Sequence, residues 1–136
     1  MPRSSAIWVL ALAAACASAP RVAPRAECPA PGPRVAPASA FPRAGDAKNG
    51  EFLFGRVCLG CHAGTAEQRA PGAPAHAPRL DCPDWLAVAS DAYLYDAINR
   101  GPGSYGHGDL PPLGERLTPR QIADLVAYLR SLGTRS

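Results

Sequence analysis

The chain has 136 residues, enough for one small domain, and five cysteines, a high count for that length. Its formal charge of +3 is uneven, because residues 1–44 carry five arginines and one acid whereas residues 45–136 carry nine basic and ten acidic residues. The C-terminal part is therefore nearly neutral and has no basic run, which argues against nucleic-acid binding.

Residues 1–16 have the pattern of an export signal. A short positive start containing Arg3 precedes an apolar run, Ala6 to Ala15, that is too brief to span a bilayer. Leu12-Ala13-Ala14-Ala15 before Cys16 is similar to a bacterial lipoprotein box, and cleavage there would leave a lipidated Cys16 at the new N-terminus. Ordinary cleavage at Ala15-Cys16-Ala17 is the alternative. We favour the lipoprotein and expect a protein anchored on the periplasmic side of a membrane.

Residues 17–44 form a proline- and alanine-rich tether. Seven prolines lie in the 23 residues from Pro20 to Pro42, so this stretch cannot form a helix or a packed core. Semi-extended proline-rich chain rises about 3 Å per residue. The tether could therefore hold a domain several nanometres from a membrane surface.

Residues 45–136 are predicted to form one all-α domain. They contain no convincing alternating strand pattern, and proline- and glycine-rich loops separate three or more helical segments. Asp46 is placed to cap the first helix, on which Phe52, Leu53 and Val57 are expected to be apolar anchors.

The C-x-x-C-H box, Cys58-Leu59-Gly60-Cys61-His62, follows this helix. Residues three and four apart share a helical face, so both thiols and the imidazole point the same way. Cys58 and Cys61 can then form thioethers with the vinyl groups of a haem while His62 binds its iron. The box predicts one covalently attached haem c.

Two other interpretations of the box remain open at this point. A thioredoxin-type redox pair would need a preceding strand and a βαβ context, and neither is visible. A zinc site would combine Cys58, Cys61, His62 and a later histidine, but adjacent Cys61 and His62 are awkwardly placed to ligate one tetrahedral ion.

Two further helices follow. Ser90 is placed to cap one that contains Tyr93, Leu94 and Ile98 and stops at Gly101-Pro102. The last helix has the clearest signals: Thr118, Pro119 and Gln121 match a cap, a first-turn proline and a capping-box partner, and Gly133 lies just past the expected end. The expected core face of this last helix consists of Ile122, Leu125, Val126 and Leu129.

Taken in chain order, these features resemble a class I c-type cytochrome, from about Asp46 to Leu132. Besides the box, the resemblance is carried by Gly50 and Phe54, Ala77-Pro78-Arg79-Leu80, Ile98-Asn99-Arg100-Gly101, Leu110-Pro111-Pro112-Leu113-Gly114, and Leu117-Thr118-Pro119 leading to Ala127-Tyr128-Leu129. It implies a small helical domain wrapped around a monohaem centre. Gly50 and Phe54 would cross the last helix near Tyr128 and Leu129, and the Pro78 backbone would orient the His62 imidazole.

The sequence departs from the family at the distal iron ligand. The loop that usually contains methionine followed by proline has Leu110-Pro111 here, and the only methionine of the chain is Met1. We favour His107 as the substitute, because four glycines between residues 101 and 108 make its loop adaptable. The alternative is an open or water-bound iron, while His76 is expected on the proximal side.

Cys28 and Cys82 remain once the other cysteines are assigned. In an oxidising compartment they could form a disulfide, or Cys82 could be an unpaired thiol packed among apolar neighbours.

The resemblance implies an electron carrier rather than an enzyme, monomeric, with redox proteins or membrane respiratory complexes as partners. A haem-based ligand-binding or sensor module with an open distal site is the alternative. Nothing in the sequence resembles a nucleophile–base pair, a phosphate loop or paired catalytic carboxylates.

Overall fold

A computed structural model describes residues 28–29, 41–42, 44–62, 70–73, 77–105 and 110–134. The described chain is helical and contains no strand, so the predicted all-α class is confirmed. The elements are α1 (Ala47–Val57), α2 (Leu59–His62), α3 (Pro83–Val88), α4 (Asp91–Arg100), the 3-10 turns η2 (Pro102–Tyr105) and η3 (Leu113–Glu115), and α5 (Pro119–Gly133).

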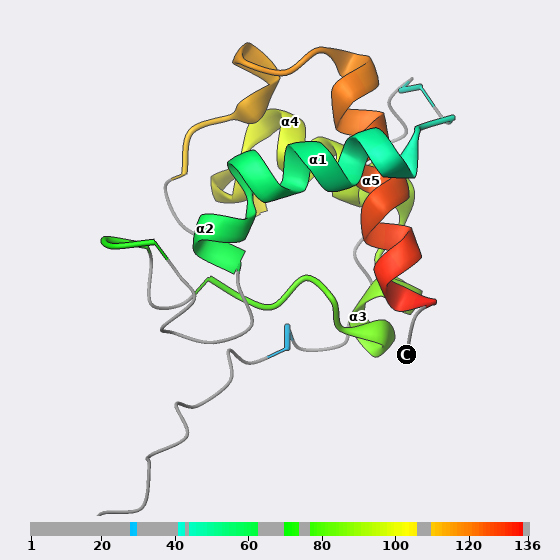
Figure 1. Ribbon diagram of the computed structural model, residues 1–136, viewed down its shortest axis with the longest axis horizontal. Helices are drawn as coiled ribbons and strands as arrows, with labels where there is room; N and C mark the ends of the chain where they lie inside the picture. Colours follow the sequence, from blue (N-terminus) through cyan, green and yellow to red (C-terminus); the bar gives the residue numbers. More distant parts are fainter. Residues whose placement is uncertain are drawn as a thin grey trace, which may run out of the picture.

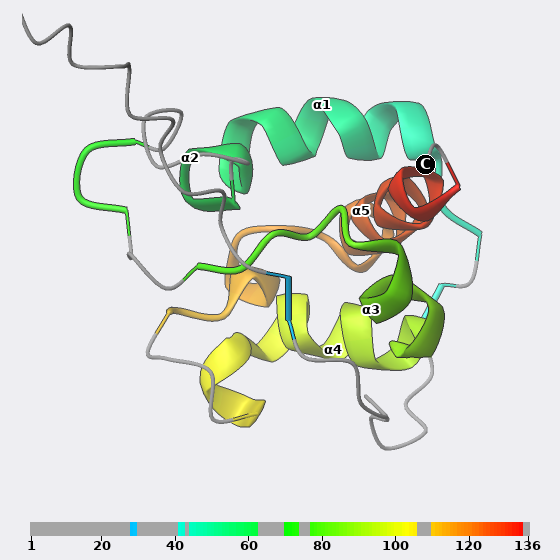
Figure 2. The ribbon, with the colours of Figure 1, turned by 90° about the horizontal axis from the view of Figure 1, so that it is seen from below.

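Helices α1 and α5 cross at the centre of the fold (Figures 1 and 2). Gly50 of α1 is buried at the crossing, where a Cβ atom would overlap the carbonyl oxygen of Asp124 and lie 2.8 Å from Cβ of Tyr128. Phe54, one turn later, packs its ring against that of Tyr128 with 5.3 Å between centroids. The expected crossing of Gly50 and Phe54 with the last helix is therefore confirmed.

A buried carboxylate holds the start of α1 onto α5. Asp46 caps α1 as expected, since its side chain accepts hydrogen bonds from the backbone N–H groups of Lys48 and Asn49. Asp124 of α5, only 3% exposed, accepts hydrogen bonds from Asp46 N and Asn49 Nδ2, each at 2.7 Å. Asp124 thus satisfies donors at the helix start that would otherwise be left unpaired.

Helix α5 begins as the sequence predicts and ends slightly later. Thr118 and Gln121 form the capping box, with Pro119 in the first turn. The expected core face is buried in full: Ile122, Leu125, Val126 and Leu129. Gly133 belongs to the last turn, with Thr134 as the C-cap, so the predicted helix end is wrong by about one residue. Helix ends fray, and such small differences are ordinary.

Helices α3 and α4 complete the core on the other side of α5 (Figure 2). Ser90 caps α4 as expected, and Tyr93 and Leu94 are buried. Arg130 of α5 binds three groups at the junction of the two helices: its guanidinium donates to the Asp91 carboxylate at 2.6 Å and to the backbone carbonyls of Leu86 and Ala89. One side chain therefore ties α5 to the end of α3 and the start of α4.

Two of the three expected anchors on α1 are exposed. Leu53 is buried, but Phe52 and Val57 are 61% and 43% exposed, so their assignment to the core is wrong. The face of α1 that meets α5 is centred on Gly50, Leu53 and Phe54, and Phe52 points away from it. The Phe52 ring instead lies 5.2 Å from the guanidinium of Arg56, a cation–π contact one turn away.

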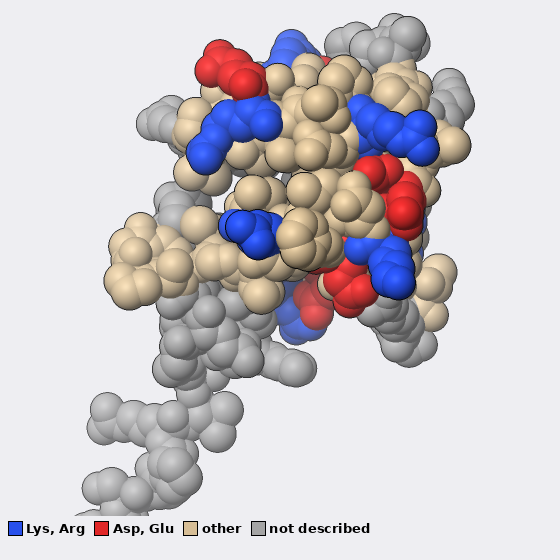
Figure 3. Space-filling model, turned by 45° about the horizontal axis from the view of Figure 1, so that its top comes forward, with Lys and Arg blue, Asp and Glu red and all other residues tan. Residues whose placement is uncertain are grey.

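One face of the molecule carries mixed charge. On the face shown in Figure 3, basic and acidic side chains lie close to one another rather than in separate areas. Among the described helices, none is long and apolar enough to cross a membrane. The division into signal, tether and domain falls largely outside the described residues and stays a prediction.

We predict that Gly50→Ala destabilises the protein, whereas Gly55→Ala on the same helix does not. The new methyl group at residue 50 must push α1 away from α5, at a cost of about 1–3 kcal/mol. At exposed Gly55 a Cβ meets nothing within 4 Å, and alanine should stabilise the helix by about 0.5–1 kcal/mol. Denaturant unfolding of both variants tests this. Equal effects of the two substitutions would contradict a tight crossing.

Candidate functional site

The C-x-x-C-H box forms a helical turn that continues α1. Cys58 is the C-cap of α1, with its N–H bonded to Phe54 O at 2.9 Å. The N–H groups of Cys61 and His62 both donate to Cys58 O, at 3.1 and 2.9 Å. Because α1 is packed on α5, the turn that follows α1 is held in place as well. Cys58, Cys61 and His62 all lie on this one short stretch of backbone.

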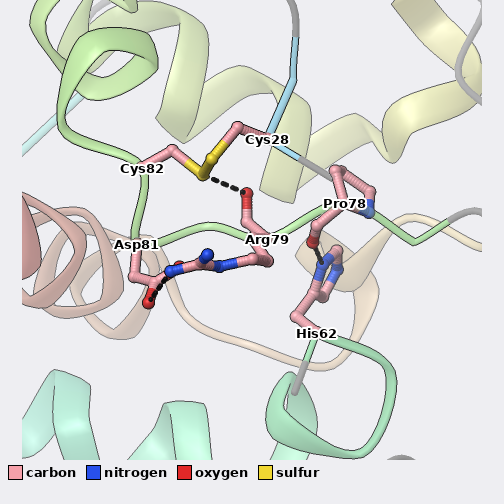
Figure 4. Close-up of a disulfide and its surroundings, with 6 residues drawn as sticks. All are labelled: Cys28, His62, Pro78, Arg79, Asp81 and Cys82. Atoms are coloured by element: carbon pink, nitrogen blue, oxygen red, sulfur yellow. Dashed lines mark hydrogen bonds and ion pairs between the residues drawn. A yellow bond between two sulfur atoms is a disulfide. The ribbon is translucent and has the colours of Figure 1, made fainter. Parts of the chain in front are cut away.

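The imidazole of His62 is oriented by the segment that follows the box. Its Nδ1 lies 2.8 Å from the carbonyl oxygen of Pro78 (Figure 4). A carbonyl only accepts, so Nδ1 carries the proton and donates it. A neutral imidazole in this tautomer has its lone pair on Nε2, the nitrogen that could bind a metal. The contact that the family resemblance implied for Pro78 is thus present.

The Cys58 thiol does not have the low pKa of a thioredoxin-type nucleophile. Cys58 and Cys61 are half-buried free thiols. Burial raises the pKa of the Cys58 thiol to about 12, and the neighbouring Cys61 adds to the increase. Reactive C-x-x-C pairs instead have a thiol of lowered pKa. None of the described residues that precede the box forms a strand either, so a dithiol redox centre is disfavoured.

The zinc alternative is not tested by the described chain. It requires a later histidine, and both later ones, His76 and His107, lie outside the described residues. Within the described residues, no group of three or more histidine, cysteine or acidic side chains is placed to hold a metal ion.

Cys28 and Cys82 form a disulfide next to this site (Figure 4). Their Cα atoms are 5.8 Å apart, and Cys82 is also buried in the core, at 2% exposed. Of the two alternatives that the sequence left open, the structure therefore has the paired form. The bond joins a residue of the predicted tether to the segment that carries Pro78.

The distal loop is anchored at both of its described ends. Gly101 has φ +83°, and a Cβ at this residue would lie 2.7 Å from Leu110 O, so the two ends of the loop touch. Leu110 is 41% exposed. His107, our candidate ligand, lies in residues 106–109, outside the described chain, as does Cys16. Both assignments stay predictions.

An ion-pair cluster that the sequence analysis missed fixes the start of this loop. The Tyr105 hydroxyl donates to Asp96 at 2.6 Å, and Arg100 donates to the same carboxylate from Nε at 2.8 Å. The Tyr105 ring also meets that of Tyr93 edge-on, with 4.8 Å between centroids. The spacing of Asp96 and Arg100, four residues apart on one helix, was the available signal.

Electrostatics in this cluster favour the charged form of Asp96. Burial alone would raise the pKa of its carboxyl, but hydrogen bonds from Arg100 and Tyr105, together with the Arg100 charge, outweigh burial and lower it. Burial and the hydrogen bond to Asp96 raise the pKa of Tyr105, so it stays a neutral donor. The Tyr105 hydroxyl is therefore held in its hydrogen bond to Asp96.

The donor set fits a covalently held haem. Two free thiols three residues apart on a helical turn match the attachment chemistry, and the adjacent histidine is held in the tautomer that binds iron. Cys58 and Cys61 could therefore hold the porphyrin and His62 its iron.

Comparison with known proteins agrees with this chemistry. The family described as "Cytochrome C oxidase, cbb3-type, subunit III" matches residues 45–129. The chain is also 31% identical, over 86 residues, to a protein named cytochrome c6 from Gloeothece citriformis (strain PCC 7424), a match that covers 63% of this chain and 71% of that protein. The chain therefore belongs to the class I c-type cytochromes, electron-transfer proteins with a covalently bound haem.

Proposed function

We propose that residues 45–136 form a monohaem electron carrier, with Cys58 and Cys61 as the attachment residues and His62 as the proximal iron ligand. The observation that carries this proposal is the hydrogen bond from His62 Nδ1 to Pro78 O at 2.8 Å. It places the imidazole in the tautomer that an iron site requires. When bound, the haem supplies a reversible one-electron couple between ferrous and ferric iron.

The residues around the haem would have distinct roles. Cys58 and Cys61 prevent dissociation by covalent attachment. The Pro78 carbonyl accepts a hydrogen bond from His62 Nδ1–H, which fixes the ring plane and makes Nε2 a stronger electron-pair donor to a metal. The crossing of α1 with α5 positions the box, which follows α1 directly.

His107 is our proposed distal ligand. Leu110 occupies the sequence position where the family usually has methionine, and leucine cannot bind iron. Tyr105, the last described residue before His107, is bonded to Asp96, and Leu110, the first one after it, lies close to Gly101. The four glycines between residues 101 and 108 make the loop adaptable enough for His107 to reach the iron. Imidazole in place of a thioether should lower the reduction potential relative to a His/Met site.

Export and a lipid anchor at Cys16 complete the proposal. The proline-rich tether would carry a monomeric domain at the periplasmic side of the membrane, within reach of redox proteins or respiratory complexes. The match to a family described as an oxidase subunit supports a membrane respiratory complex as one such partner.

Covalent attachment is tested by intact mass after expression with a c-type maturation system. The wild type should carry the mass of one haem after denaturation, and Cys58→Ala/Cys61→Ala should carry none. Leu59→Ala, within the same box, is the matched control and should retain the haem. A wild type that carries zinc and no haem, or a double variant that keeps covalent haem, would overturn the assignment.

Distal ligation is tested by absorption and low-temperature EPR spectra with and without carbon monoxide. We expect a low-spin, carbon-monoxide-resistant wild type and a high-spin His107→Ala variant that binds carbon monoxide. His76→Ala is the matched control and should resemble the wild type. A high-spin wild type that binds carbon monoxide readily would instead favour the second candidate function, a haem-based ligand-binding or sensor module, for which Leu110 is the supporting observation.

The anchor is tested by fractionation of bacteria that express the full chain. The wild type should be found with membranes and incorporate a labelled fatty acid, and Cys16→Ser should lose both properties. Cys28→Ser, a cysteine substitution in the tether, should keep both. Label that persists in Cys16→Ser would show that Cys16 is not the lipidated residue.

A further inference from the structure

The segment that orients His62 has no regular structure of its own. Residues 77–82 form neither helix nor strand, yet Pro78 in this segment supplies the acceptor for His62 Nδ1. A carbonyl in an irregular segment stays in place only if contacts around it restrain the backbone. The strength of those restraints therefore decides how well the imidazole is oriented.

One restraint is an ion pair between Arg79 and Asp81. Nε and Nη2 of Arg79 donate to the two carboxylate oxygens of Asp81, each at 2.9 Å. The Asp81 side chain is 49% exposed, so solvent screens this pair and it restrains the segment weakly. On the other side of Pro78, Ala77 is buried, at 5% exposed.

The stronger restraint is Cys82. It is 2% exposed, stands at the N-cap of α3 and is bonded covalently to Cys28. Its Sγ lies 3.8 Å from the Arg79 carbonyl oxygen, which is a packing contact because a disulfide sulfur has no proton to donate (Figure 4). The cross-link therefore lies directly against the backbone that follows Pro78.

We propose that the Cys28–Cys82 disulfide is a positioning element for His62: by fixing residues 77–82, it keeps the Pro78 carbonyl on Nδ1. Cys82 is four residues after Pro78 in the sequence, and four residues of fully extended chain span at most about 14 Å. The sulfur of Cys82 also touches the carbonyl oxygen of Arg79, the residue after Pro78, so the cross-link acts on the backbone next to the hydrogen bond. The proposal rests on His62 being the proximal ligand.

The expected consequence has a definite sign. Donation of the Nδ1 proton to a carbonyl makes the imidazole a stronger donor, which favours ferric iron. If the segment loosens, that hydrogen bond weakens, and the ferrous state becomes more stable relative to the ferric state. Removal of the cross-link should therefore raise the reduction potential.

The first variant is Cys28→Ser, which removes the cross-link and leaves the buried Cys82 side chain in place. We expect its equilibrium constant for reduction to rise about threefold or more, which is about 30 mV for one electron. Amide hydrogen exchange in residues 79–82 should accelerate selectively. In the cyanide-bound ferric protein, which is low-spin whatever its sixth ligand, the NMR signals of the His62 ring should shift.

The control is Ile122→Ala, a fully buried site on α5 with no covalent link to this segment. A core truncation lowers global stability on the scale of a lost cross-link. It should leave the potential and the His62 signals unchanged, so that a general loss of stability cannot imitate the proposed effect. Equal shifts in both variants would overturn the proposal.

If Cys28→Ser does not assemble, the disulfide is reduced in wild-type holoprotein with a phosphine, which leaves thioethers intact, and the same signals are followed. Unchanged His62 signals in a cross-link-free holoprotein would overturn the proposal, as would free thiols at both cysteines in the native protein. Failure of the wild type to bind haem at all would instead overturn the proposed function.

Discussion

The close approach of α1 and α5 is the constraint on which the rest of the structure depends. Gly50 allows the two backbones to meet, and Asp124 then reaches the start of α1 to accept hydrogen bonds from Asp46 and Asn49. A buried carboxylate is tolerated there because its partners satisfy it. The C-x-x-C-H box follows without interruption at the other end of α1, so the same crossing that forms the core also determines where the thiols and His62 lie.

The two sides of the site are held by different physical means. On the side of His62, residues 77–82 have no regular structure, and Cys82 at their end is buried and bonded to Cys28. On the distal side, a charged cluster of Asp96, Arg100 and Tyr105 fixes the start of the loop. The described segment next to His62 is thus held by a covalent bond and by burial, whereas the described start of the other loop is held by charged hydrogen bonds.

The disulfide also changes how the predicted tether relates to the domain. Cys28 lies well before α1 in the sequence, yet it is bonded beside the site, and Phe41 stacks on Tyr95 of α4 with 5.0 Å between ring centroids. Cys28 and Phe41, two residues of the proline-rich stretch, therefore belong to the folded domain. A composition that cannot form a core by itself can still be attached to one by single strong contacts.

The sequence by itself determined the helical class, the helix starts and the box, because these depend on local chemistry. Asp46, Ser90 and Thr118 cap their helices through side-chain bonds to residues two or three positions away, and the turn at the box needs only its own backbone. The family resemblance further placed Pro78 at His62. Tertiary structure alone decided the exposure of Phe52 and Val57, the choice of Asp124 as a partner for α1, and the pairing of Cys28 with Cys82. Each of these depends on which residues far apart in the chain are brought together, and neither helical periodicity nor cysteine count contains that information.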